Sequence, residues 1–187
     1  MAQECFLARG YAATSMSEIA ARLGGSKGTL YGHFKSKDEV FDAVVRRQCQ
    51  AMRRSVCSIA PGGEEAPRAR LARFGMVSLE FLLSPDVLAF HRLALAESER
   101  FPQLGEAFFA CGPQVLTARI ADYLGELMER GLLRRADRSG AAQHLMDLAV
   151  FGIYERRLLG VIEDLGPGQA DRRLQAAVDT FLRAYAA

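Results

Sequence analysis

Apolar residues recur at helical spacing along almost the whole chain, with polar residues between them. No segment shows the strict alternation of apolar and polar residues that is typical of a half-buried strand. Proline and glycine divide the pattern into separate helices, and the clearest breaks are Pro61-Gly62-Gly63, Phe101-Pro102 and Gly166-Pro167-Gly168. The pattern predicts an all-α protein of about nine helices, with a domain boundary near residues 60–61.

Two short helices joined by a glycine turn are predicted over about residues 15–34. Ser15 is followed three residues later by Glu18, which is the spacing of a capping box at a helix start. Gly24 and Gly25 then end the first helix, because glycine adopts left-handed backbone conformations at low cost.

The second of these helices is weak by composition. Ser26 can cap its start, but Gly28 and Gly32 lie inside it, and each costs about 1 kcal/mol relative to alanine. Leu30 and Phe34, one helical turn apart, supply an apolar face. We therefore expect packing against neighbouring helices to hold this helix in place.

The opposite face of the second helix carries side chains that can recognise DNA, namely Lys27, Thr29, Tyr31 and His33. Such side chains can donate to phosphates or contact base edges, and the free N–H groups at the helix start favour a phosphate. The layout is that of a helix-turn-helix, whose second helix enters the major groove. The alternative is an ordinary helical corner with a solvated polar face, because such spacings also arise by chance.

Residues at fixed spacing across this segment carry a family resemblance, and S-K-G-T-L-Y-x-H-F-x-S-K is its most specific part. They are Phe6, Gly10, Thr14-Ser15, Ile19-Ala20, Gly24, Ser26, Gly28-Thr29-Leu30-Tyr31, His33-Phe34 and Ser36-Lys37. The segment resembles the N-terminal domain of the TetR family of bacterial transcriptional regulators. The resemblance implies a DNA-binding domain over residues 1–60. The DNA-binding residues are expected to be Thr14, Ser15, Ser26, Lys27, Gly28, Thr29, Tyr31, His33 and Lys37.

Two features depart from the family pattern. Gly25 stands where the family usually has valine, so a looser turn is expected. The chain also opens at Met1-Ala2-Gln3, already inside what should be the first helix. We therefore expect a first helix that is truncated, either because the true start of the chain precedes Met1 or because this protein has lost it.

Composition places few limits on this picture but agrees with it. The chain has 187 residues and 50% hydrophobic residues, enough for a core, with no apolar run near the roughly 20 residues of a membrane span and no secretory signal. Cys5, Cys49, Cys57 and Cys111 show no paired spacing, which favours a reducing cytoplasm. Residues 1–60 hold nine Lys or Arg against five Asp or Glu, an excess that suits a polyanionic partner.

Residues 61–187 carry no pattern of catalytic or metal-binding residues. No HExxH, CxxC or Ser-His-Asp arrangement occurs, and His91 and His144 are the only histidines there, so we expect no catalytic site, no metal and no cofactor. The family resemblance implies instead a helical bundle that binds a small molecule and dimerises through its last two helices. Phe90 to Pro113 resembles a subgroup of repressors linked to efflux and stress genes.

Two sets of residues are assigned to these roles. The expected effector-binding residues are Phe74, Val77, Phe81, Phe90, His91, Leu93, Phe108, Phe109, Gln114, Met146, Val150 and Tyr154. Apolar stripes at helical spacing are usually plain core, which is the alternative for each. The expected dimer interface comprises Leu145, Leu148, Ala149, Gly152, Ile153, Leu174, Val178, Phe181 and Leu182, and its alternative is a face buried within one bundle.

The sequence therefore predicts a cytoplasmic homodimeric transcriptional regulator rather than an enzyme or a membrane protein. Its expected partners are a palindromic double-stranded DNA operator and a small, largely apolar effector that releases it as a repressor. The alternative is an orphan or architectural DNA-binding regulator without an effector.

Overall fold

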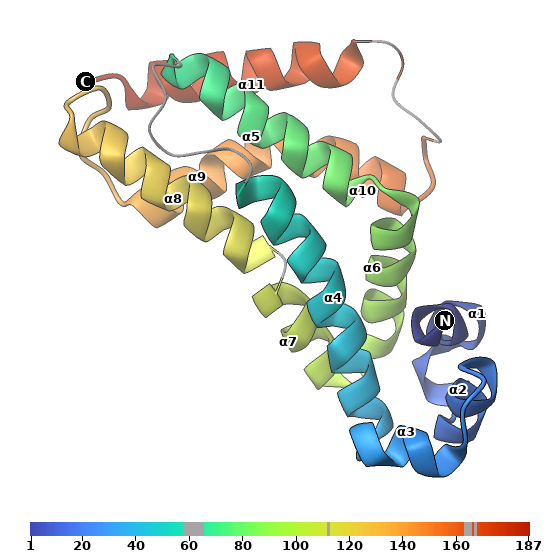
Figure 1. The fold of residues 1–187 in the computed structure, drawn as a ribbon. Helices are drawn as coiled ribbons and strands as arrows, with labels where there is room; N and C mark the ends of the chain where they lie inside the picture. Colours follow the sequence, from blue (N-terminus) through green and yellow to red (C-terminus); the bar gives the residue numbers. More distant parts are fainter. Residues whose placement is uncertain (58–65, 112, 163–165, 167) are drawn as a thin grey trace. The chain divides into compact units, whose positions relative to one another are not determined.

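The computed structural model describes residues 1–57, 66–111, 113–162, 166 and 168–187 (Figure 1). These residues form helices and contain no strand, so the predicted all-α class is confirmed. The elements are α1 (Ala2–Ala13), α2 (Met16–Arg22), α3 (Lys27–His33), α4 (Lys37–Cys57), α5 (Pro67–Leu82), α6 (Pro85–Ser98), α7 (Pro102–Cys111), α8 (Pro113–Glu129), α9 (Arg138–Met146), η1 (Asp147–Phe151), α10 (Gly152–Leu158) and α11 (Gln169–Tyr185).

Two helical stretches are interrupted within their length. The stretch from Arg138 to Leu158 contains a π-helical segment, η1, so that α9, η1 and α10 follow one another directly. Helix α1 continues to Ala13 beyond a kink at Gly10, where φ is 79°. This positive φ favours glycine, and a Cβ at Gly10 would also lie 3.0 Å from Glu97 Oε1.

The chain forms two compact units. Unit 1 comprises Met1–Ala51 and Pro85–Gly112, and unit 2 comprises Met52–Ser84 and Pro113–Ala187. The boundary predicted near residues 60–61 lies among residues that the structure does not describe. By contact, α6 and α7 group with the helix-turn-helix segment in unit 1 rather than with the remainder of residues 61–187.

Unit 1 is built around aromatic rings from α1, α4 and α6. The ring of Phe41 stacks on Phe90 at 5.0 Å between centroids. It also meets the rings of Phe6 and Tyr11 edge-to-face, with centroid distances of 5.4 and 5.3 Å. All four side chains are almost completely buried. Because α1 lies against α6 and α2 against α3, this cluster holds the short helices in place (Figure 1).

A polar network around Tyr11 ties α1 to α4 and α7. The Tyr11 hydroxyl donates to Asp38 Oδ1, and the Gln103 amide donates to the same oxygen at 2.9 Å. The hydrogen bond from Tyr11 lowers the pKa of Asp38, whereas burial raises the pKa of Tyr11. The network therefore fixes the register of these three helices while Asp38 is ionised.

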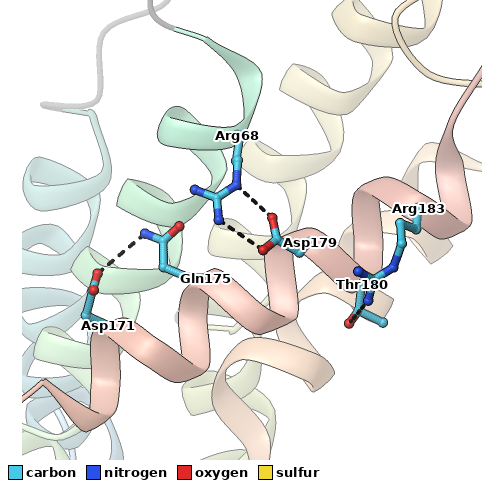
Figure 2. A network of polar contacts seen from close by, with 6 residues as sticks. All are labelled: Arg68, Asp171, Gln175, Asp179, Thr180 and Arg183. Carbon is cyan, nitrogen blue, oxygen red and sulfur yellow. Dashed lines mark hydrogen bonds and ion pairs between the residues drawn. The ribbon is translucent and has the colours of Figure 1, made fainter.

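Unit 2 is a bundle in which α5 lies beside α11 and α8 beside α9 (Figure 1). A Cβ at Gly75 would lie 2.5 Å from Leu174 Cδ2, so this glycine permits the close packing of α5 against α11. Arg68 donates to both carboxylate oxygens of Asp179, at 2.7 and 3.0 Å, across the same pair of helices (Figure 2). This ion pair lowers the pKa of Asp179.

Candidate nucleic-acid interface

The segment from α2 to α3 has the caps that the sequence predicts. Ser15 Oγ accepts a hydrogen bond from the Glu18 N–H at 3.2 Å, and Ser26 Oγ accepts one from the Thr29 N–H at 3.0 Å. Gly24 has a φ of 71° and turns the chain between the two helices. The Glu18 carboxylate pairs with Arg9 at 3.0 Å instead of returning to the backbone of Ser15, so only half of the expected capping box forms.

Helix α3 contacts the rest of unit 1 through a narrow apolar edge. Leu30 is its buried residue, and Phe34, at the C-cap, is half-buried. Every other residue of the helix is exposed, including the polar residues that were predicted to face DNA. They are Lys27, Gly28, Thr29, Tyr31 and His33, with Ser26 at the cap. The helix therefore presents a continuous polar surface to solvent.

Tyr31 and Lys27 form the most prominent part of this surface. Tyr31 is 45% exposed, and the Lys27 ammonium lies 5.9 Å from the centroid of its ring. A phenol and an ammonium held together on an exposed helix can contact a base edge and a phosphate at neighbouring positions. The Thr29 hydroxyl is paired with Ser26 Oγ at 2.9 Å, so its methyl group remains to contact an apolar base edge such as thymine.

Thr14 and Lys37 are turned toward the protein rather than toward solvent. Thr14 is 2% exposed, and its hydroxyl donates to the Gly10 carbonyl at 2.7 Å. The Lys37 ammonium donates to the carbonyls of Tyr11 and Ala12 and lies 4.4 Å from the Tyr11 ring centroid. Both side chains donate to backbone carbonyls near the end of α1, which lack partners within the helix. The spacing of residues in the sequence does not show this role.

Lys35 is an exposed basic residue that was not among the expected DNA-binding residues. It follows α3 directly, and its backbone N–H donates to Glu39 Oε2 at 2.7 Å, which fixes the loop. The signal that could have found it is its position, since a lysine between a reading helix and the next helix cap lies near the DNA backbone in a helix-turn-helix.

The expected effector-binding residues do not form one cluster. Phe90, His91, Leu93, Phe108 and Phe109 belong to unit 1, and the others belong to unit 2. Phe90 and Leu93 are part of the core of unit 1, whereas Phe109 is 61% exposed. In unit 2, Gln114 is exposed, Val150 and Tyr154 lie in one core cluster, Phe74, Val77 and Phe81 lie in another, and Met146 contacts both.

His91 has an unusual environment within unit 1. Its ring stacks on Phe108 at 4.4 Å between centroids, and burial lowers the pKa of His91 to about 4. The imidazole is therefore neutral at physiological pH.

The expected dimer face is largely internal to unit 2. Six of its nine residues are buried there: Leu145, Ala149, Ile153, Leu174, Val178 and Phe181. Leu148, by contrast, is exposed, as are Phe151 at 58% and Leu159 at 70%. Helical periodicity gives the same pattern for either face, so the sequence carried no signal for this choice.

The described helices were also compared with the length and apolar character of a membrane-spanning helix. Among them, no single helix combines the length and the apolar character of a membrane span, and α5 and α6 reach both only when they are counted together.

Comparison with known proteins gives consistent matches over both units. Residues 1–44 match the family model of bacterial regulatory proteins of the tetR family. Residues 69–187 match the C-terminal domain of AefR-like transcriptional repressors.

Solved structures match over nearly the full chain. The flavonoid-responsive regulator FrrA is 30% identical, with a TM-score of 0.88, over 99% of this chain and 93% of that one. A protein of Mesorhizobium loti MAFF303099 assigned to the TetR family is 27% identical, with a TM-score of 0.85, over 100% of this chain and 93% of that one.

The match to a curated relative is confined to the N-terminal part. The transcriptional activator FasR of Mycolicibacterium smegmatis is 54% identical over 46 residues, which are 25% of this chain and 21% of FasR. The two family models and the full-length structural matches together cover both units and the helix-turn-helix itself. The chain belongs to the TetR family of bacterial transcriptional regulators, which are DNA-binding proteins and not enzymes.

Proposed function

We propose that this regulator is a homodimeric repressor that reads its operator with the exposed face of α3 and leaves it when a small apolar molecule binds. The observation that carries the proposal is the polar surface of α3, which is capped at Ser26 and packed against unit 1 only through Leu30 and Phe34. Because packing buries so little of its surface, α3 is free to enter the major groove.

The proposed division of labour on DNA follows from where the side chains lie. Tyr31, His33 and the methyl group of Thr29 contact base edges, while Lys27 and Lys35 contact phosphates. The N–H groups at the start of α3 and the exposed Ser15 add phosphate contacts. Thr14 and Lys37 act indirectly, because their polar atoms hold α1 in place.

We propose that a second copy covers the exposed apolar residues of η1 and α10. Leu148 and Phe151 in η1 and Leu159 at the end of α10 are exposed apolar residues of unit 2, which favours self-association. A dimer would place two copies of α3 about 34 Å apart, so that they meet successive major grooves on one side of a palindromic operator.

The choice of repressor over activator is supported by the extent of each similarity. The likeness to AefR-like repressors covers residues 69–187, which include unit 2 apart from residues 52–68. The likeness to the activator FasR is limited to 46 residues. The part of the molecule that would determine the response to a ligand is therefore the part that resembles repressors.

Chain connectivity supports control by an effector. Helix α4 begins in unit 1 and ends in unit 2, and the chain passes between the units again after Ser84 and before Pro113. A ligand that favours one arrangement of unit 2 can act on α3 through these connections, with a coupling of about 1–3 kcal/mol. FrrA, which is similar over 93% of its length, is flavonoid-responsive, so flavonoids are the first effectors to test.

Recovery of bound fragments from the source genome by the full-length native protein tests the proposal. We expect a palindromic fragment to be enriched, and Tyr31→Ala to weaken its binding about tenfold or more without changing the melting temperature. Phe109→Ala, which removes an exposed ring of the same unit outside α3, serves as the matched control and should bind normally. Failure to enrich any fragment, or full affinity in Tyr31→Ala, would contradict the proposal.

Effector control is tested on the same complex. Flavonoids and other apolar compounds are added while operator binding is followed by fluorescence anisotropy. Release of the operator supports the repressor model, tighter binding indicates an activator, and a compound that binds without altering operator affinity indicates a regulator that lacks an effector response.

A further inference from the structure

A cavity of about 450 Å³ lies between α10 and the start of α11 within unit 2. Its size falls in the range of small-molecule sites. Two isoleucines form its apolar part, and arginine, glutamine and glycine form the remainder. The lining residues that belong to the described part of the chain are Ile153, Arg156, Ile162, Gly166, Gln169, Arg172 and Arg173.

Three of these seven residues are arginines, and none is acidic. Within the described part of the chain, the guanidinium groups of Arg156, Arg172 and Arg173 have neither a hydrogen bond nor an ion pair to another side chain. The nearby acids of α11 are engaged elsewhere, since Asp171 accepts from Gln175 and Asp179 holds Arg68 (Figure 2). The cavity therefore carries three positive charges that no described carboxylate neutralises.

Two glycines lie close to the guanidinium groups of Arg172 and Arg173. A Cβ at Gly152 would lie 3.1 Å from an Arg173 guanidinium nitrogen, and one at Gly168 would lie 3.1 Å from an Arg172 nitrogen. Gly168 has a φ of 69° and caps α11 without a side chain, so the first N–H groups of that helix add partial positive charge.

We propose that this cavity binds a small organic oxyanion, a carboxylate or a phosphate ester, whose apolar portion contacts Ile153 and Ile162. Guanidinium groups match both oxyanions because their planar forks donate two parallel hydrogen bonds. The anion would remove the mutual repulsion of the three arginines, and the isoleucines exclude water from the attached chain. The site is separate from α3, and the inference does not depend on the proposed function.

Isothermal titration of the full-length protein in low-salt buffer free of phosphate tests the site directly. The probes are octanoate, octyl phosphate, inorganic phosphate and uncharged octanol. We expect octanoate and octyl phosphate to bind more tightly than inorganic phosphate, which lacks the apolar chain, and octanol, which lacks the charge. The relative affinities of octanoate and octyl phosphate distinguish a carboxylate site from a phosphate site.

Matched variants locate the binding. Arg172→Gln with Arg173→Gln should weaken octanoate and octyl phosphate about tenfold or more, because charge-assisted hydrogen bonds are lost. Arg130→Gln with Arg135→Gln makes the same charge change at exposed positions elsewhere in unit 2 and should have little effect. Arg172→Lys with Arg173→Lys keeps the charge and should recover only part of the affinity, since lysine lacks the planar fork.

Several outcomes would overturn the proposal. They are equal binding of octanol and octanoate, no binding of any anion at millimolar concentration, or the same loss of affinity in both double Gln variants. Glu163 and Asp164, which lie outside the described residues, provide a further test. If anions bind only after Glu163→Gln with Asp164→Asn, the chain's own carboxylates occupy the arginines and the cavity is not a ligand site.

Discussion

The core of unit 1 contains a connected group of aromatic rings, whereas the buried aromatic residues in the larger core of unit 2 lie in two pairs, Phe74 with Tyr123 and Phe181 with Tyr185. In unit 1, Phe41 contacts three other rings that come from α1 and α6. In unit 2, burial is spread over α5, α8, α9 and α11, and no single ring connects them all. We therefore expect unit 1 to depend on one central residue more than the bundle does.

The two units also differ in how their functional surfaces arise. The surface of α3 follows from local caps and one buried leucine, all within a dozen residues. The surfaces of unit 2 depend on which faces of its helices meet, and those contacts join residues far apart in the chain, such as Arg68 and Asp179. Local signals therefore fix the recognition surface, and long-range packing fixes the rest.

The largest expected effect comes from Phe41→Ala. Removing a fully buried ring costs about 3–5 kcal/mol, and in unit 1 it takes away the contacts that join α4 to α1 and α6. We expect faster hydrogen exchange throughout unit 1 and loss of operator binding, as measured by mass spectrometry and fluorescence anisotropy.

Phe181→Ala is the matched substitution in unit 2, because that ring is equally buried. Its exchange effects should be confined to α11 and its neighbours, with operator binding weakened less than in Phe41→Ala. Equal loss of operator binding in the two variants would show that unit 1 does not depend on its aromatic centre in the way described.

Lowering the pH should have an intermediate effect on folding stability. Burial lowers the pKa of His91 from 6.5 to about 4. Between these pH values, His91 is therefore protonated in the unfolded chain but neutral in the folded protein. Folding stability should therefore be complete above about pH 7 and fall as the pH drops toward 4. The loss should reach about 2 kcal/mol, after allowance for solvent screening at a partly exposed ring.

Urea unfolding at several pH values measures this dependence. His91→Phe keeps a ring against Phe108 but cannot titrate, so its stability should vary less over the same range. His33→Gln, at an exposed position of α3, is the control. If His91→Phe shows the same pH dependence as the native protein, His91 is not the group responsible.

The smallest effects come from two helix caps, one in each unit. Ser26→Ala removes the cap of α3, and Asp137→Ala removes the cap of α9, where the carboxylate accepts from Ser139 and Gly140. Each should cost about 1 kcal/mol of stability in thermal unfolding. Only Ser26→Ala should also weaken operator binding, because α3 itself then frays.

The local part of the recognition site could be predicted from the sequence. Ser15, Gly24 and Ser26 mark the ends of α2 and α3, and each acts on backbone groups within a few residues of itself. The alternation of Leu30 with polar neighbours placed the exposed face for the same reason. The all-α class followed because helical periodicity needs no knowledge of distant contacts.

The internal roles of Thr14 and Lys37 could not be predicted, because their partners are carbonyls at the end of another helix. The sequence also could not predict that α6 and α7 group with unit 1, because an apolar residue such as Phe90 fits the core of either unit.

Short-range spacing along the chain was enough to predict the helical class, the caps, the polar face of α3 and the family motif. Tertiary structure decided which apolar residues are core and which, like Phe151 and Leu159, remain on the surface. It also brought Arg156 together with Arg172 and Arg173 around one cavity. The physical reason is that periodicity shows that a helix has an apolar face, but only the packing of distant helices decides what that face meets.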